Sequence, residues 1–431
     1  MAAKQCRPKS TLAEARKLRR HAQLPYGRPS AACDVQWGTI QPTGGQLVRH
    51  RTRRTPRASL RFAGEFAPLT LSCIALLGRK DEPTDAVEEY CRYLAHALLA
   101  QDIVLDIRRV PWEMDGWSGA LQQLRHQASQ WAGTWVIVQY TALAWSRRGF
   151  PQKLVRVLRI LKSGGARVCT IFHDVEPYPG SRLIDSIRRL KQVSTMRQVV
   201  ALSERSAFTV PPERLSWLTS VPRNSVFVPV GPNIPIPPIP SMPTQQVSVP
   251  TIGVFSITGG DAGARETQSI IASVRYAAQK LGKLRLSVFG RHAELRESEL
   301  RVGLRDLPVE LLVEGIVEPA RVVQKLSACD VLLFVRGIIS SRRGSAIAAI
   351  ACGLPVIAYS GSETTSPITE AGVVLVDRDQ PDQLNAALVL LLSDSTHRMN
   401  LAARSREAYK THFAWPAIAA VWNAILTPRR P

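Results

Sequence analysis

The sequence predicts an α/β protein with two Rossmann-like, doubly wound domains, and two observations support this. Apolar runs of strand length alternate with amphipathic, helix-length segments through most of the chain. The alternation stops at a proline-rich stretch and then restarts. Proline at this density is typical of a semi-rigid connector. We therefore expect domains at 67–231 and 251–397, joined by a linker at 232–250.

The first domain is expected to open with a buried strand at 69–78 and a helix from about Asp85 to Ala100. Apolar positions on that helix recur at spacings of three and four, which is typical of one buried face. Asp85 stands where an N-cap is expected, and Glu88 would complete a capping box. Further strands are expected at 103–110, 134–141, 166–174, within 196–211 and at 225–231, with helices at about 120–132 and 152–162.

The second domain repeats the same alternation. Its expected strands are 251–257, 284–290, 309–317, 331–335, 356–359 and 372–377. Its expected helices are 265–281, 294–304, 318–329, 346–352 and 382–392. A helix at about 398–412 and an apolar segment at 413–426 end the chain.

The net charge is +22 at pH 7 and is unevenly distributed. Residues 1–61 contain 14 Lys and Arg against 2 Asp and Glu, so 14 − 2 = +12 lies in this segment. Like charges with little apolar periodicity predict a disordered basic extension at 1–66. An electrostatic membrane contact and a nucleic-acid arm are the alternatives for this segment. The excess charge favours anionic partners.

The seven cysteines are scattered, without a Cys-x-x-Cys pair or a framework spacing. This pattern is typical of a reducing compartment and argues against structural zinc. No apolar run reaches the length of a membrane span, and the sequence shows no signal-peptide pattern. We therefore expect a cytoplasmic protein, which its basic charge would allow to lie peripherally on the inner face of the membrane.

The stretch from Val331 to Tyr359 has the pattern of an anion site. A buried strand leads into a polar, basic turn, and a helix of small residues follows. The first N–H groups of a helix lack internal partners and carry partial positive charge. Arginines in the turn would add bidentate phosphate contacts, although solvated arginines and capping serines are the alternative. The candidate phosphate-binding residues are Ser340, Ser341, Arg342, Arg343, Gly344 and Ser345.

A second candidate cluster, His173, Asp174 and Glu176, stands at the end of the strand expected at 166–174. Ligands of open α/β sheets bind outside the carboxyl ends of the strands. Two such sheets would share a ligand crevice between those ends. We therefore expect this cluster to border the crevice.

Segments 313–326, 327–335 (SACDVLLFV) and 350–358 (IACGLPVIA) resemble GT-B glycosyltransferases, most of all glycosyltransferase family 4 (group 1). The resemblance covers about 69–426. It implies that the second domain binds a nucleotide-sugar donor, that the first domain faces an acceptor, and that helices in 398–431 cross back to the first domain. It places Gly315 and Ile316 near the nucleotide base, Arg265 near the diphosphate, Asp85 near the acceptor, and His173, Asp174 and Glu176 near the transferred sugar.

The sequence departs from the family pattern at the phosphate turn. The family usually has two glutamates eight residues apart, and the corresponding residues here are Ser340 and Ala348. Either donor-phosphate binding is rebuilt on Arg342, Arg343 and Arg265, or the ability to transfer sugar is altered.

The expected function is that of a hexosyltransferase, which moves a sugar from a nucleotide-diphosphate donor with retention and without a metal. Arginines and a helix N-terminus would stabilise the leaving diphosphate. No cofactor is expected besides the donor substrate, and Asp377-Arg378-Asp379 is expected to be a turn at a helix start. The expected partners are a glycan or lipid-linked acceptor and an anionic membrane surface, but not nucleic acid. The alternative is a non-catalytic GT-B-fold protein that binds a nucleotide or a partner.

Overall fold

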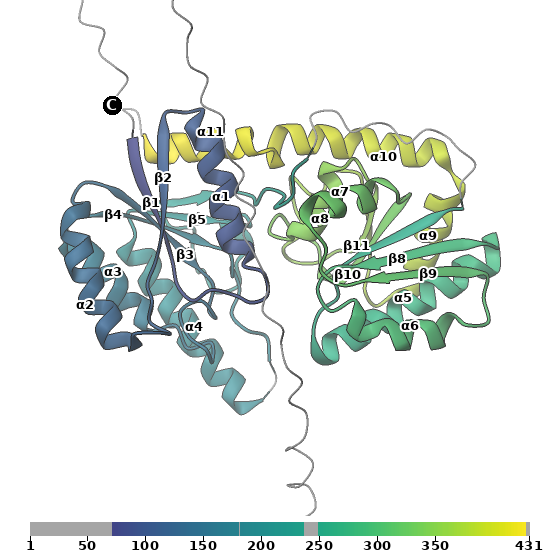
Figure 1. Ribbon diagram of the computed structural model, residues 1–431, viewed down its shortest axis with the longest axis horizontal. Helices are drawn as coiled ribbons and strands as arrows, with labels where there is room; N and C mark the ends of the chain where they lie inside the picture. Colours follow the sequence, from purple (N-terminus) through teal and green to yellow (C-terminus); the bar gives the residue numbers. More distant parts are fainter. Residues whose placement is uncertain (1–70, 181, 237–248, 428–431) are drawn as a thin grey trace, which may run out of the picture. The chain divides into compact units, whose positions relative to one another are not determined.

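A computed structural model describes residues 71–180, 182–236 and 249–427, which all belong to one compact unit. The extension expected at 1–66 and most of the linker expected at 232–250 lie outside these ranges. The described chain builds two parallel six-stranded sheets (Figure 1). We call the part around the first sheet the N-lobe and the part around the second sheet the C-lobe.

The N-lobe sheet has the strand order β2-β1-β3-β4-β5-β6. Alternate residues of β1 enter two cores, because successive side chains of a strand point to opposite faces. Ile74 and Leu76 pack with helices α2, α3 and α4, whereas Cys73 and Ala75 pack with α1 and α11. The strands are β1 Leu71–Leu77, β2 Ile103–Arg109, β3 Trp135–Tyr140, β4 Arg167–Phe172, β5 Arg205–Phe208 and β6 Ser225–Phe227. The helices are α1 Ala86–Leu99, α2 Gly116–Ala128, α3 Lys153–Ser163 and α4 Leu183–Leu202.

The C-lobe sheet has the strand order β12-β11-β10-β7-β8-β9. Helices cover both faces of this sheet, so its central strands are largely apolar. The strands are β7 Thr251–Phe255, β8 Leu284–Phe289, β9 Val309–Glu314, β10 Val331–Ile338, β11 Val356–Tyr359 and β12 Val373–Val376. The helices are α5 Gly260–Leu281, α6 Glu297–Leu304, α7 Pro319–Ser327, α8 Gly344–Ala351 and α9 Pro381–Ser393.

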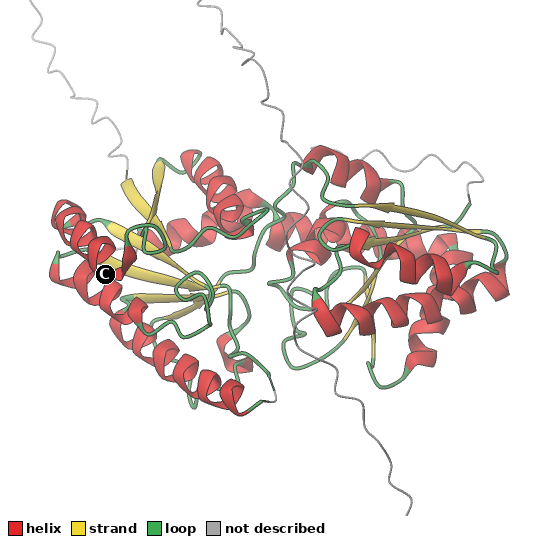
Figure 2. Cartoon of the chain, turned by 60° about the horizontal axis from the view of Figure 1, so that its bottom comes forward, coloured by secondary structure: helices red, strands yellow, loops and turns green. Residues whose placement is uncertain are grey.

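The C-terminal helices cross back to the N-lobe, as the sequence predicts. Helix α10 (Ser395–Ala408) packs on α8 and α9, and a π-helical turn, Tyr409–Phe413, joins it to α11 (Trp415–Leu426). Helix α11 then packs on α1. The indole N–H of Trp422 donates to the hydroxyl of Tyr90 at 3.0 Å. This helix therefore completes the N-lobe core. Figure 2 shows the whole chain from a second direction.

The structure corrects three predicted elements. The strand expected within 196–211 is β5, but residues 196–202 before it belong to α4, a helix that the sequence did not predict because its apolar residues do not follow one face. Helix α5 begins at Gly260 rather than at 265. The sequence predicted a later start because Gly260 and Gly263 are residues that disfavour a helix. The capping box at α1 is absent, since the Glu88 carboxylate binds Arg92 and Arg109 instead.

Each sheet has one point where the strand order reverses. In the N-lobe it lies between β1 and β3, and in the C-lobe between β7 and β10. Such switch points open a crevice outside the carboxyl ends of the strands, where ligands of α/β proteins bind. No helix in the described ranges has both the length and the apolar character needed to span a bilayer.

Candidate functional site

A cavity of about 390 Å³ lies at the C-lobe switch point. Ser256 after β7, Arg291 after β8 and Arg336 in β10 contribute to its walls. The opposite wall comes from the N-lobe, through Thr84 and the first turns of α1. We call this space the interlobe cavity.

Four arginines line the interlobe cavity: Arg291, Arg336, Arg342 and Arg343. Desolvation, followed by the charge of Arg342, lowers the pKa of Arg343 to about 10. Desolvation also lowers the pKa of Arg336; the charge of Glu266 opposes this effect and that of Arg291 adds to it. The Nε of Arg336 has no hydrogen-bond partner among the described residues. Cations held together away from water would be stabilised by an anion in the cavity.

Arg342 differs from its neighbours because it has a buried carboxylate partner, Glu363. Its Nε and Nη2 donate to the two carboxylate oxygens at 2.7 and 2.8 Å, and the Ser340 hydroxyl donates to the same carboxylate at 3.0 Å. Desolvation opposes the ionisation of Glu363, but these hydrogen bonds and the arginine charges lower its pKa below the ordinary value. The charge of Arg342 is thus largely compensated within the protein.

The structure divides the predicted phosphate turn into two parts. Gly344 and Ser345, at the start of α8, line the interlobe cavity. Ser340 and Ser341 are buried behind it. The Ser341 hydroxyl donates to the carbonyl of Thr209 at 2.6 Å, so this serine fastens the turn to the N-lobe.

The remaining donor-site candidates are also divided. Ile316 lines the cavity. Gly315 lies behind it, and its carbonyl accepts from the amide of Gly290 at 2.8 Å. Arg265 is exposed on α5 and does not line the cavity.

Sequence reasoning missed several cavity residues, among them Arg291 and Arg336. Arg291 reaches the N-lobe, where its guanidinium donates to the Asp81 carboxylate at 3.1 Å and to the Thr84 carbonyl at 2.7 Å. Both arginines stand at the carboxyl end of an apolar strand, in Phe289-Gly290-Arg291 and Phe334-Val335-Arg336. An arginine at the carboxyl end of an apolar strand is the sequence signal that could have identified both residues.

A second cavity, of about 220 Å³, lies at the N-lobe switch point between the ends of β1 and β3. Gly78, Gln139, Leu143 and Asp174 are among its lining residues, as is the predicted acceptor residue Asp85. We call it the N-lobe cavity.

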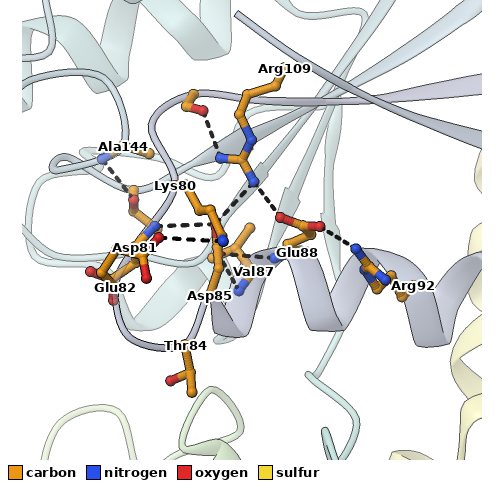
Figure 3. A network of polar contacts seen from close by, with 12 residues as sticks. Lys80, Asp81, Glu82, Thr84, Asp85, Val87, Glu88, Arg92, Arg109 and Ala144 are labelled. Carbon is orange, nitrogen blue, oxygen red and sulfur yellow. Dashed lines mark hydrogen bonds and ion pairs between the residues drawn. The ribbon is translucent and has the colours of Figure 1, made fainter. Parts of the chain in front are cut away.

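Asp85 is the N-cap of α1, as predicted. Its Oδ1 accepts from the amides of Val87 and Glu88, and its Oδ2 accepts from Arg109 at 3.1 Å (Figure 3). Arg109 also donates to the Gly78 carbonyl, at 2.8 Å. Asp85 therefore stabilises the loop that borders both cavities, and the same residue faces the N-lobe cavity.

The three candidate residues that follow β4, namely His173, Asp174 and Glu176, have different surroundings. The amide of Ala142 donates to Asp174 at 2.8 Å, and desolvation raises the pKa of this carboxyl despite that bond and the nearby arginine charges. His173 Nε2 lies 2.9 Å from the Gln139 side-chain oxygen. Glu176 is used elsewhere, because its carboxylate accepts from the amide of Ser216 at 2.7 Å. Asp174 therefore faces a cavity, whereas Glu176 holds a loop.

His173 predicts a pH dependence of stability. Desolvation lowers its folded-state pKa from 6.5 to about 4, so above pH 6.5 the residue is neutral in both states. As the pH falls from 6.5 toward 4, the unfolded state gains the proton first, and stability is lost. We expect His173→Gln to abolish a loss of about 2 kcal/mol between pH 7 and about pH 5. Urea unfolding of both proteins at the two pH values measures this, and parallel losses would contradict it.

In the part of the chain that the structure describes, no group of three or more His, Cys, Asp or Glu side chains is arranged to hold a metal ion. Asp377 instead accepts a hydrogen bond from the amide of Asp379 at 3.0 Å, just before α9. The Asp-x-Asp segment is therefore a turn at a helix start, as predicted.

No family model matches the sequence, and no curated protein matches it significantly. Similar solved structures do exist. Sucrose-phosphate synthase from Thermosynechococcus elongatus is 16% identical, with a TM-score of 0.60 over 82% of this chain and 98% of that one. A glycosyltransferase from Rickettsia africae is 12% identical, with a TM-score of 0.59 over 84% and 100%. HepE from Anabaena, solved with UDP and glucose, is 14% identical, with a TM-score of 0.57 over 83% and 99%.

These structures are GT-B glycosyltransferases, and each is matched over nearly its whole length. The two parallel six-stranded sheets of this chain, with their helices, match these structures over most of the chain. The protein therefore has the GT-B fold of glycosyltransferases.

Proposed function

We propose that the protein is a glycosyltransferase that takes a sugar from a nucleotide-diphosphate donor held in the interlobe cavity. The observation that carries the proposal is the arginine cluster at the C-lobe switch point. Arg336 and Arg343 lack a carboxylate partner among the described residues and are depressed in pKa, so they favour a multiply charged anion. A diphosphate meets that requirement, and HepE, which has the same fold, was solved with UDP.

In the proposed reaction, the bond between the anomeric carbon of the sugar and the diphosphate breaks, and that carbon bonds to an acceptor oxygen. Arg343, Arg336 and the first amides of α8 stabilise the charge on the leaving diphosphate. We propose that these groups take the place of a metal ion. We further propose that the acceptor oxygen attacks the anomeric carbon from the face that the diphosphate leaves, so that the stereochemistry is retained.

The acceptor is proposed to enter through the N-lobe cavity, where Asp174 supplies a carboxylate. Its raised pKa makes this carboxylate a better proton acceptor than an ordinary aspartate. The acceptor hydroxyl transfers its proton to Asp174 as its oxygen bonds to the sugar. His173 is neutral at pH 7 and is proposed to hydrogen-bond the sugar rather than to carry charge. The acceptor class proposed is a glycan or a lipid-linked sugar.

The proposal predicts that a nucleoside diphosphate stabilises the folded protein. A ligand at a hundredfold excess over its Kd adds about 2.7 kcal/mol to the free energy of unfolding. We expect the rise in the melting temperature to identify the preferred base, with UDP as the first compound to test. The sugar nucleotide of that base is then incubated with the protein, and release of the diphosphate is measured. Lack of stabilisation by any common nucleoside diphosphate would exclude this site.

A non-catalytic nucleotide-binding protein is the second candidate, and one observation favours it. Where the resembling family has two glutamates, Ser340 is buried and Ala348 lines the interlobe cavity without a carboxylate. Glu363 brings a carboxylate to within 3.0 Å of the Ser340 hydroxyl, but Arg342 occupies it. Nucleotide stabilisation without turnover of any sugar nucleotide would support this candidate. Turnover that Asp174→Asn abolishes would exclude it.

A further inference from the structure

Exposed apolar side chains gather on the first half of α4. Leu183 is 89% exposed and Leu190 is 70% exposed, and Ile184 and Ile187 between them are also exposed. At 3.6 residues per turn, these positions form one stripe along the helix. Such a stripe on a protein surface marks an interaction site rather than ordinary surface composition.

The stripe has basic flanks. Residues 182–197 contain five basic side chains and one acidic side chain. The acidic residue, Asp185, is buried and paired with Arg188. Exposed cations therefore border the apolar stripe with no exposed carboxylate in this segment. The basic residues are Arg182, Arg188, Arg189, Lys191 and Arg197.

The same helix is tied to the mouth of the N-lobe cavity. Arg188 donates from Nε to the carbonyl of Arg148 at 3.0 Å, in the loop 141–150. That loop also contributes the exposed Leu143 to the lining of the cavity. In Figure 1, the first turns of α4 lie at the lower edge of the N-lobe. The stripe and the cavity thus share one loop.

We propose that the α4 face, formed by Leu183, Ile184, Ile187 and Leu190 with its basic flanks, docks onto an anionic lipid bilayer. A helix with an aliphatic stripe and Lys or Arg at its edges is the type that lies in the bilayer interface. Anionic headgroups attract the basic flanks while the stripe enters the acyl boundary. Protein interfaces, in contrast, are enriched in aromatic residues, whereas the four residues of this stripe are all aliphatic. Docking there holds the N-lobe cavity close to the membrane surface.

This docking goes beyond the proposed transfer reaction and does not require it. A protein that fails to turn over any sugar nucleotide would still bind vesicles through α4. Conversely, an active transferase that ignores vesicles would disprove the docking alone.

The test measures partition of the full chain onto vesicles of phosphatidylcholine, with and without phosphatidylglycerol. We expect Leu183→Gln/Leu190→Gln to reduce partition onto the anionic vesicles about tenfold, because apolar area no longer enters the interface. The matched control is Leu295→Gln/Val302→Gln, since these C-lobe residues are 74% and 65% exposed and lie outside α4. The basic extension is the same in all three proteins, so its contribution cancels.

Loss of partition in the α4 variant, with the control unchanged and with phosphatidylglycerol required, supports the proposal. Equal partition of the two variants overturns it, as does binding that is indifferent to phosphatidylglycerol. Size-exclusion chromatography without vesicles tests whether a second copy of the chain binds this face instead. A native oligomer that only the α4 variant converts to monomer overturns the proposal and assigns the face to a second copy of the chain.

Discussion

Arg342→Ala is expected to lower the free energy of unfolding by about 3–5 kcal/mol, the largest effect on stability that we predict. The Arg342 side chain is 19% exposed and that of Glu363 is 5% exposed, so the pair is largely withdrawn from water. Removal of the arginine leaves a buried carboxylate with only the Ser340 hydroxyl as a hydrogen-bond donor among the described residues. Urea unfolding at pH 7 measures the loss.

The double variant Arg342→Met/Glu363→Gln serves as the control. Because it removes both charges, we expect it to lose about 1 kcal/mol or less relative to the native protein. The pair also predicts a pH dependence. The folded-state pKa of Glu363 lies below 4.5, so its contribution is present above pH 4.5 and is lost as the pH falls through the folded-state value. A single variant as stable as the double variant would show that water reaches the Glu363 carboxylate.

The ion pair also limits what Arg342→Ala can reveal about ligand binding. If this destabilised variant failed to bind a nucleotide, a lost phosphate contact could not be distinguished from a structural change. The residues that test the anion site are therefore those with no carboxylate partner, Arg343 and Arg336.

The sequence predicted most of the fold because the apolar runs of both sheets are buried on both faces. The prediction failed at α4, where the apolar residues do not all face the core. Leu183, Ile187 and Leu190 face solvent on one side of the helix. The buried apolar residues of its second half, such as Met196 and Val199, lie on the other side, so no single apolar stripe runs along the helix. The exposed apolar residues that interrupt the pattern of this helix are also the residues that suggest its docking role.

The candidate site was less predictable than the fold. Local pattern identified Arg342 and Arg343 in the turn before α8, because a strand, a basic turn and a helix start are adjacent in the chain. Arg291 and Arg336 come from separate strands and meet only because the strand order reverses between β7 and β10. The partner of Arg342 lies 21 residues away in sequence and follows a different strand. A local sequence pattern does not show which residues from different strands will meet in the folded protein.

Arg343→Gln is expected to act in the opposite direction from Arg342→Ala. Its pKa of about 10 shows that the folded protein disfavours the charge, so removal of the charge should leave stability unchanged or raise it by roughly 1 kcal/mol. Nucleoside diphosphate binding should weaken about 10- to 100-fold, since a charge-assisted contact to phosphate is lost. Urea unfolding and calorimetric titration measure the two effects. Arg265→Gln, on the exposed surface of α5, should change neither. Strong binding by the Arg343 variant together with weak binding by the Arg265 variant would move the diphosphate site from the start of α8 to the start of α5.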